Sequence, residues 1–247
     1  MTPPAAGSSA AAIVPAAGRG ERLGPGRPKA LRLLGGLPLL VHAVSALARA
    51  RFVDVVVVAA PPDGIAEVRA LLALHEVPAE VEVVAGGPTR QDSVRGALAA
   101  LPEAVDVVLV HDAARPLAPS ELADAVVAAV RAGADAVVPG LPVADTVKRV
   151  DADGLVLETV DRAWLRAVQT PQGFRRPVLA AAHAAAALGE SGPADPRPAT
   201  DDAQLVERLG HPVTVIAGAE EAFKVTRPLD LVLAETVLTR RRLAGAR

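Results

Sequence analysis

The hydrophobic positions of this chain fall into short, nearly continuous runs of Val, Ile, Leu and Ala, separated by longer segments of mixed polarity. Such runs suit strands that are covered on both faces, as in parallel sheets. We expect strands over residues 11–15, 53–60, 81–85, 105–110, 136–138 and 213–217. We expect helices over residues 38–50, 63–75, 90–101, 119–132, 177–188 and 228–241, several with Pro in the first turn. The alternation predicts an α/β fold: one Rossmann-like domain over residues 11–242, with a mostly parallel sheet flanked by helices.

One region departs from this alternation. Residues 145–170 contain short alternating pieces around Asp151-Ala152-Asp153-Gly154, which predicts a hairpin turn and a projecting β-arm. An isolated hairpin is marginally stable in water, so such an arm favours a homodimer in which a partner subunit covers it. Residues 1–10 are rich in Pro, Ala and Ser and predict a disordered tail, and residues 189–199 predict a flexible loop.

Composition narrows the class of protein. Hydrophobic residues make up 51% of the 247 residues, enough for one buried core, and the formal net charge of −2 gives no basic footprint for nucleic acid. The chain has no Cys, which excludes disulfides, thiolate catalysis and Cys-based zinc sites. The longest uncharged stretch, residues 33–48, is too short and too interrupted to span a membrane, and the start has no positive segment typical of a secretion signal. We therefore expect a soluble, cytoplasmic protein that binds neither nucleic acid nor membrane.

The loop after the first predicted strand is rich in small and cationic residues. It reads Pro15-Ala16-Ala17-Gly18-Arg19-Gly20-Glu21-Arg22-Leu23-Gly24 and continues to Lys29. Small residues let the backbone approach a ligand, and successive N–H groups can hold phosphate oxygens. A Walker A loop is excluded because no Gly-Lys-Ser/Thr follows. Arg22 and Lys29 favour a nucleoside triphosphate loop. A dinucleotide loop, disfavoured by Leu23 at the third glycine position, and a plain Gly-rich turn remain alternatives.

Two further segments follow predicted strands. Asp112 comes directly after the fourth, and ligands of doubly wound sheets bind beyond the carboxyl ends of strands. A carboxylate there suits Mg²⁺ held against triphosphate oxygens, although an Asp that caps the next segment is the alternative. The segment Gly86-Gly87-Pro88-Thr89-Arg90-Gln91-Asp92-Ser93 follows the third strand and opens a helix. By itself it fits a helix cap as well as a binding loop.

More motifs occur in order along the chain. They are His111-Asp112-Ala113-Ala114-Arg115-Pro116, Asp145-Thr146-Val147-Lys148-Arg149, Gln169-Thr170-Pro171-Gln172-Gly173-Phe174, Thr200-Asp201-Asp202-Ala203 and Phe223-Lys224-Val225-Thr226-Arg227-Pro228. With the Gly-rich loop, they resemble the 2-C-methyl-D-erythritol 4-phosphate cytidylyltransferase family of the sugar-phosphate nucleotidyltransferases, over about residues 13–235. The resemblance implies an enzyme that transfers CMP from CTP to methylerythritol phosphate and releases pyrophosphate, in non-mevalonate isoprenoid biosynthesis.

The resemblance also implies particular site residues. It implies catalytic cations at Arg22, Lys29, Arg162 and Lys224, and a Mg²⁺ ion on Asp112. It implies nucleotide contacts from Ala16, Ala17, Gly18, Gly20, Gly87 and Ser93, and substrate contacts from Asp112, Arg115, Thr146, Thr170 and Thr200. Arg162 and Thr146 would reach from the arm to the acceptor in the other subunit. Glu221 lies where relatives often carry Asp and is a candidate second acid near the metal, whereas we expect His111 to be structural.

Two alternatives stay open. A related cytidylyltransferase that acts on ribitol or another pentitol 5-phosphate would carry similar loops, and a non-catalytic nucleotide-binding module would share the fold. The presence of Arg22, Lys29 and Asp112 together favours an active enzyme. A phosphate monoester has a second pKa of about 6 and is largely dianionic at pH 7, so it can attack without a general base.

Overall fold

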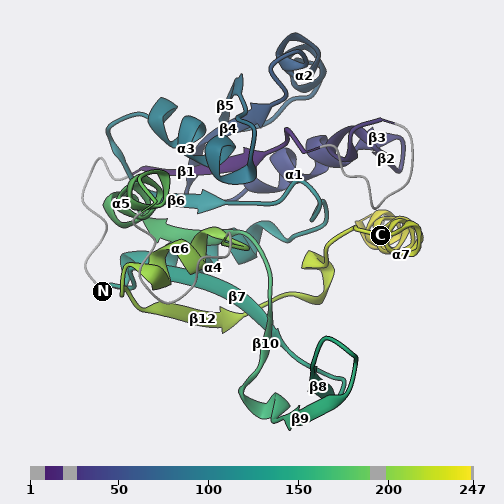
Figure 1. The fold of residues 1–247 in the computed structure, drawn as a ribbon. Coiled ribbons are helices and arrows are strands. Elements are labelled where there is room, and N and C mark those ends of the chain that lie inside the picture. Colours follow the sequence, from purple (N-terminus) through teal and green to yellow (C-terminus); the bar gives the residue numbers. More distant parts are fainter. Residues whose placement is uncertain (1–8, 19–26, 190–198, 246–247) are drawn as a thin grey trace.

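The computed structural model describes residues 9–18, 27–189 and 199–245, which form the predicted α/β fold (Figure 1). The strands are β1 (Ser9–Pro15), β2 (Leu33–Leu34), β3 (Leu37–Pro38), β4 (Val53–Ala60), β5 (Glu80–Ala85), β6 (Val105–Val110), β7 (Ala136–Pro142), β8 (Val147–Val150), β9 (Val156–Val160), β10 (Arg166–Val168), β11 (Gln172–Arg175) and β12 (Val213–Ala217). The helices are α1 (Leu39–Ala48), α2 (Ile65–Ala73), α3 (Arg90–Ala100), α4 (Ser120–Arg131), α5 (Arg176–Ala187), α6 (Asp202–Arg208) and α7 (Pro228–Gly245), with short 3-10 helices η2 (Lys29–Leu31), η3 (Arg162–Trp164) and η4 (Glu220–Ala222).

The main sheet has the strand order β10-β7-β11-β6-β1-β4-β5, with β12 paired to β7. Strands β6, β1, β4 and β5 are mutually parallel, and β12 runs parallel to β7, which confirms the predicted parallel sheet. Strands β10 and β11 are antiparallel to their neighbours. The sequence did not predict these two strands, because each is a short segment with an Arg at one end and no apolar run.

Successive side chains along the central strands enter opposite faces of the sheet, which explains why these strands are apolar throughout. In β1, Ala10, Ala12 and Val14 belong to the core layer that includes buried residues of α1, α2 and α4. Ala11 and Ile13 belong to the other layer, with buried residues of α3, α5 and α6. Small Ala and Val side chains fill both layers, so both faces of the sheet are covered. A ligand can therefore reach the sheet only at its edges.

The β-arm is a two-stranded antiparallel sheet of β8 and β9 that extends away from the domain (Figure 1). Gly154 has a φ of 84° in the turn, a conformation that favours glycine. The Asp151 carboxylate accepts hydrogen bonds from the N–H groups of Asp153 (3.0 Å) and Leu155 (2.9 Å). The hairpin and its turn are therefore confirmed. The arm is shorter than the predicted 145–170, because β10 has already returned to the main sheet beside β7.

The ends of the domain differ from the prediction. Residues 1–8 of the predicted tail, residues 19–26 of the Gly-rich loop and most of the predicted loop over 189–199 lie outside the described residues. Strand β1 begins at Ser9, so the domain starts before the predicted boundary at residue 11. Helix α7 continues to Gly245, past the predicted end. None of the described helices is long and apolar enough to cross a membrane. The cytoplasmic location stays a prediction.

Candidate active site

The loops that carry the candidate residues meet at one edge of the sheet. Strands β1, β4, β5 and β6 are parallel, so their carboxyl ends point the same way, the usual place for ligands in open α/β sheets. Ala16, Ala17 and Gly18 follow β1, Gly87 follows β5 and Asp112 follows β6. The sheet topology thus brings together residues from three separate motifs.

Three cavities lie along this edge. The first, about 380 Å³, is mainly apolar and is lined by Ala17 and Gly87 among others. The second, about 200 Å³, is lined by both of these residues and by Asp112. The third, about 170 Å³, is lined by Lys29, Asp112 and Lys224. Because adjoining cavities share residues, they offer one ligand an apolar compartment followed by a cationic one.

The loop after β5 is shaped by its own hydrogen bonds. The Gly87 N–H donates to Oγ of Ser93 (3.0 Å), and that hydroxyl donates to the Thr89 carbonyl (3.0 Å). Thr89 and Asp92 form the capping box that starts α3. A Cβ on Gly87 would collide with Asp92, so this turn requires glycine. Ser93 therefore holds the loop in shape, and its contact with a nucleotide stays a prediction.

Asp112 is the acid at the centre of the edge and has a cation on each side. Its Oδ2 accepts a hydrogen bond from Nζ of Lys224 (2.7 Å), and its Oδ1 lies 3.6 Å from Nε of Arg90. Burial raises the pKa of the Asp112 carboxyl, but Lys224 and Arg90 outweigh burial and bring the pKa to about 2. The carboxylate is consequently ionised at neutral pH.

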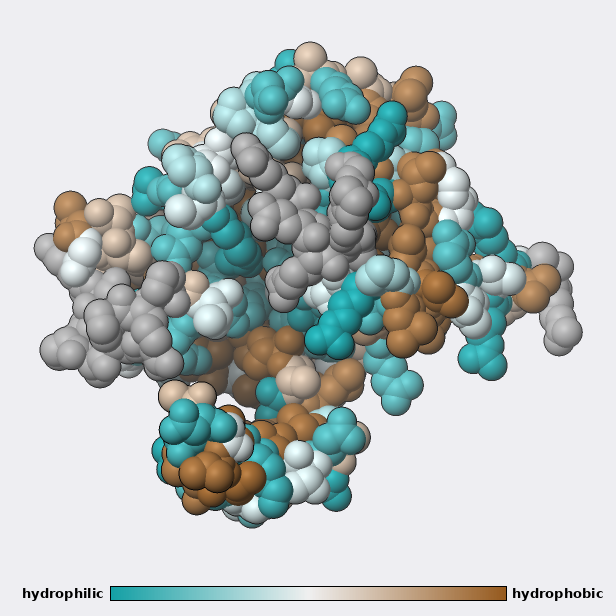
Figure 2. All heavy atoms as spheres, turned by 45° about the vertical axis from the view of Figure 1, so that its right-hand side comes forward, coloured by the Kyte–Doolittle hydropathy of each residue, from teal (hydrophilic) through white to brown (hydrophobic). Residues whose placement is uncertain are grey.

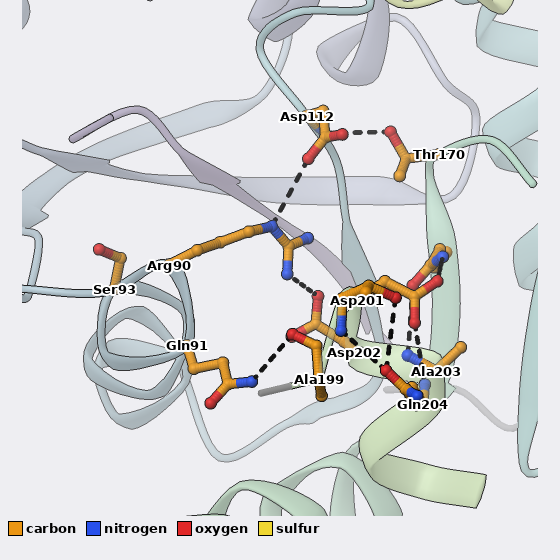
Figure 3. Close-up of polar contacts among 12 residues, drawn as sticks. Arg90, Gln91, Ser93, Asp112, Thr170, Ala199, Asp201, Asp202, Ala203 and Gln204 are labelled. Atoms are coloured by element: carbon orange, nitrogen blue, oxygen red, sulfur yellow. Dashed lines mark hydrogen bonds and ion pairs between the residues drawn. The ribbon is translucent and has the colours of Figure 1, made fainter. Parts of the chain in front are cut away.

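A buried His–Thr pair fixes the backbone of Asp112. The Asp112 N–H donates to Oγ1 of Thr170 (3.0 Å), and Oγ1 lies 3.1 Å from Nδ1 of His111 (Figure 3 shows the first contact). The other ring nitrogen, Nε2, lies 3.2 Å from the carbonyl oxygen of Arg115, which can only accept. Nε2 therefore carries the proton, and the Thr170 hydroxyl donates to Nδ1. Burial lowers the pKa of His111 to about 4, which favours this neutral ring.

This network changes the part expected of Thr170. We expected Thr170 to contact substrate from the arm, whereas the structure buries it in the body of the domain. Its hydroxyl already donates to His111 and accepts from Asp112. Thr170 thus supports the turn that presents Asp112.

Arg115, which is predicted to bind substrate phosphate, has contacts within the protein. Its side chain is directed into the protein, and the residue is only 9% exposed. The NH1 group donates to the Ala222 carbonyl (2.7 Å), and the NH2 group donates to the Val168 carbonyl (3.2 Å). Burial lowers the pKa of this guanidinium, although the charge of Asp112 raises it in part. Arg115 therefore ties together three segments around the site.

The remaining predicted cations occupy different places. Lys29 begins η2 and lines the cavity that also contains Asp112 and Lys224. Arg22 and Gly20 lie outside the described residues. The structure therefore brings two of the four predicted catalytic cations to one cavity.

The residues predicted to act across a dimer lie on or near the arm. Arg162 is exposed at the start of η3 and donates to the Ala144 carbonyl, and Thr146 directly precedes β8. Among the described residues, no hydrogen bond or ion pair joins Arg162 to Asp112. Thr200 is exposed, and its N–H donates to Oε1 of Gln204 (2.8 Å) at the start of α6.

Glu221 does not line the cavities that contain Asp112. Its Oε2 accepts a hydrogen bond from Nε of Arg241 in α7 (2.9 Å). It lines a separate cavity with Arg49 and Ser120, and Asp112 does not line that cavity. The expectation of a second acid beside Asp112 is therefore not supported, because Glu221 pairs with Arg241 of α7 at another surface.

Figure 3 shows two residues of the site that the sequence analysis left without a function, Arg90 and Asp202. Arg90 donates through NH1 to Oδ2 of Asp202 (2.7 Å), and Asp202 is fully buried. The Thr200-Asp201-Asp202 motif was visible in the sequence, but two adjacent acids look alike there. Only the fold separates them, because Asp201 caps α6 by accepting from the Gln204 N–H (2.9 Å).

Asp112 alone does not form a complete Mg²⁺ site, but it can supply one ligand to the ion. Among the described residues, no three or more His, Asp or Glu side chains form a group that could hold a metal ion. Mg²⁺ is commonly bound through one or two carboxylates together with substrate phosphates. Asp112, ionised and 14% exposed at its side chain, therefore suits an ion that arrives with a triphosphate.

Comparison with known proteins identifies the family of this chain. The model of the 2-C-methyl-D-erythritol 4-phosphate cytidylyltransferase family matches residues 10–240. The chain belongs to this family. The cytidylyltransferase of Streptomyces avermitilis is 57% identical over 98% of this chain and 96% of its own length. That of Frankia casuarinae is 60% identical over 96% of this chain and 84% of its own length.

Solved structures agree with the family assignment. The 4-diphosphocytidyl-2C-methyl-D-erythritol synthase of Anaerococcus prevotii superposes with a TM-score of 0.81 at 28% identity, over 94% of this chain and 97% of that one. The cytidylyltransferase of Thermus thermophilus superposes with a TM-score of 0.73 at 37% identity, over 93% and 98%. Membership of the family makes this chain a cytidylyltransferase and disfavours the non-catalytic alternative.

Proposed function

We propose that this family member transfers CMP from CTP to 2-C-methyl-D-erythritol 4-phosphate and releases pyrophosphate. The observation that carries the proposal is the position of Asp112, ionised between Lys224 and Arg90 in a groove that also contains Lys29. The family and the names of its members supply the two substrates.

The groove suggests how CTP lies. The apolar cavity beside Ala17 and Gly87 is suited to the flat cytosine ring, with backbone groups of the loops as hydrogen-bond partners. The triphosphate then extends into the cationic cavity toward Lys29. Ala16 and Gly18 approach the phosphates through their backbone, which small residues permit.

In the reaction, an oxygen of the acceptor phosphate attacks the α-phosphorus of CTP. A new P–O bond forms as the bond from the α-phosphorus to the bridging oxygen breaks, and that oxygen leaves with pyrophosphate. The acceptor is largely dianionic at neutral pH and needs no base to remove a proton. Catalysis therefore consists of positioning and of balancing negative charge, for which we assign Lys29 and Arg22 to the reacting phosphates.

Asp112 would hold Mg²⁺ together with the phosphates of CTP. A bound Mg²⁺ offsets the negative charge of the triphosphate. We assign Oδ1 of Asp112 to the ion, because Oδ2 accepts a hydrogen bond from Lys224. We propose that Lys224 turns to the acceptor phosphate when the substrates bind. Among the described residues, Lys224 also lines a neighbouring cavity with Thr226 and Arg227, which gives it room to do so.

The arm completes the site in a homodimer. Figure 2 shows apolar side chains on the arm, in the lower part of the view. Val150, Leu155, Val156 and Leu157 are exposed there, and Trp164 is 85% exposed. A partner subunit that covers this surface would also receive Arg162 and Thr146, which we assign to its acceptor. Sedimentation should show a dimer, and Trp164→Glu should shift it toward monomer. A wild-type monomer at micromolar concentration would contradict this arrangement.

Pyrophosphate release with purified protein, CTP and Mg²⁺ tests the main proposal, with methylerythritol phosphate or ribitol 5-phosphate added in turn. Release with methylerythritol phosphate is the expected result. Release with ribitol 5-phosphate alone would keep the chemistry and replace the acceptor. Folded protein that binds CTP but releases pyrophosphate with neither acceptor would overturn the proposal.

A further inference from the structure

The guanidinium of Arg90 lies between two carboxylates that belong to different parts of the fold (Figure 3). Arg90 is the first residue of α3, and its NH1 group lies 2.7 Å from Oδ2 of Asp202 at the start of α6. Its Nε lies 3.6 Å from Oδ1 of Asp112, after β6. The two distances are unequal, so Arg90 is bound closely to Asp202 and only loosely to Asp112.

Asp202 is a buried anchor with both oxygens engaged. It is fully buried, and its Oδ1 accepts a hydrogen bond from Nε2 of His183 in α5 (2.9 Å). Burial raises the pKa of Asp202, but the His183 hydrogen bond and the charge of Arg90 lower it below its usual value overall. A buried charge is unfavourable unless it is paired, so Arg90 and Asp202 hold each other in place.

Without Asp202, the guanidinium of Arg90 would be free to bind Asp112 more closely. A guanidinium binds carboxylates readily, often through two parallel hydrogen bonds. Oδ2 of Asp112 already accepts from Lys224. If Arg90 also closed on Oδ1, both oxygens of Asp112 would be occupied by the protein's own cations. Asp202 prevents this by fixing the guanidinium at a distance at which its charge still acts on Asp112.

We propose that Arg90 is a positioning residue of the active site, anchored by Asp202 and His183, which orients Asp112 while leaving Oδ1 of Asp112 accessible. This inference rests on the function proposed for Asp112 and adds a residue set that the predicted site did not include. It also accounts for the second acid of the Thr200-Asp201-Asp202 motif, which lies far from Asp112 in the sequence.

A double-mutant cycle with Arg90→Gln and Asp202→Asn tests the proposal, with kcat/KM for CTP as the readout. Each single variant should lose about 10- to 100-fold, typical for residues that orient a metal-binding side chain. If Asp202 acts through Arg90, the double variant should lose no more than the poorer single variant. Arg95→Gln is the matched control, because Arg95 lies on the same helix and pairs with Asp92 (2.7 Å). It should keep wild-type kinetics.

Two further measurements separate positioning from general loss of structure. Thermal melting should show Arg90→Gln as the least stable variant, because Asp202 loses its cation, with stability partly restored in the double variant. Arg90→Lys keeps a charge without the planar fork, so it should fold and still lose activity. Calorimetric titration with CTP, with and without Mg²⁺, measures the dissociation constant of CTP for each variant of the cycle. This measurement needs no acceptor. The cycle can thus be followed even if methylerythritol phosphate is not the acceptor.

Losses that multiply in the double variant would overturn the proposal, because Asp202 would then act independently of Arg90. So would wild-type kinetics and CTP affinity in Arg90→Lys and Asp202→Asn. Failure of the wild-type protein to release pyrophosphate would instead contradict the proposed function.

Discussion

The edge of the sheet that carries Asp112 and the β-arm differ in how their charged side chains are paired. At the edge, Asp112, Arg90 and Asp202 are partly or wholly buried, and each has partners within the same chain. On the arm, Arg149 pairs with Glu158 at the surface (3.1 Å), and Arg162 donates to the backbone carbonyl of Ala144. The edge is ordered by the chain itself, whereas the arm keeps apolar and cationic groups exposed.

This difference indicates where each part of the function is prepared. Buried ion pairs and hydrogen-bonded turns hold a site in position before a ligand arrives. Exposed pairs contribute little to stability and leave side chains able to reorient. We infer that the CTP half of the site is organised within one subunit, and that the acceptor half is completed by assembly. Four substitutions test this comparison, given from the largest expected effect to the smallest.

Lys29→Ala should have the largest effect. Removal of one well-placed charge donor from such a site typically lowers kcat about 10²–10³-fold. Thermal melting checks that the variant remains folded. Steady-state pyrophosphate release checks the rate, and Arg240→Ala, an exposed cation of α7, is the control. Turnover near the wild-type rate would remove Lys29 from the proposed mechanism.

Arg115→Ala should mainly reduce stability. The substitution leaves the Ala222 and Val168 carbonyls without their donor, at a cost of about 2–4 kcal/mol in the free energy of unfolding. Denaturant unfolding measures this loss. The contrary result, unchanged stability with a raised KM for a substrate, would return Arg115 to the phosphate-binding function expected from the sequence.

His111 should make stability depend on pH in the ligand-free protein. Its pKa is lowered by burial from an ordinary 6.5 to about 4, so the unfolded chain binds a proton that the folded protein does not. The contribution of His111 to stability is thus fully present above the pKa of the unfolded chain and is lost as pH falls toward 4. Between pH 7 and pH 5 the His111 contribution should fall by about 2 kcal/mol. Denaturant unfolding at both pH values measures it, and His111→Gln should show a smaller difference.

Arg162→Ala should have the smallest effect and should act on one substrate. Loss of a charge-assisted contact should raise the KM for the acceptor about tenfold and change the KM for CTP little. Arg149→Ala is the control from the same arm. Equal increases for both substrates would contradict the division between the edge and the arm.

The sequence alone predicted the fold class, the hairpin of the arm, and the loops that gather at the edge of the sheet beside Asp112. It did so because burial on both faces leaves a readable pattern of apolar runs, and because glycines and cations after a strand indicate phosphate binding. Strands β10 and β11 were not predicted, because strands of three and four residues are too short to carry such a pattern.

The tertiary structure alone decided which polar residues face the groove and which support it. Arg115 and Thr170 were predicted only as substrate contacts, and the fold also gives them partners within the protein. Arg90 and Asp202 had no function assigned from the sequence, and the packing of α3, α5 and α6 joined them beside Asp112. The physical reason is that motifs record residue types along the chain, whereas burial and charge pairing depend on neighbours that only the folded chain brings together.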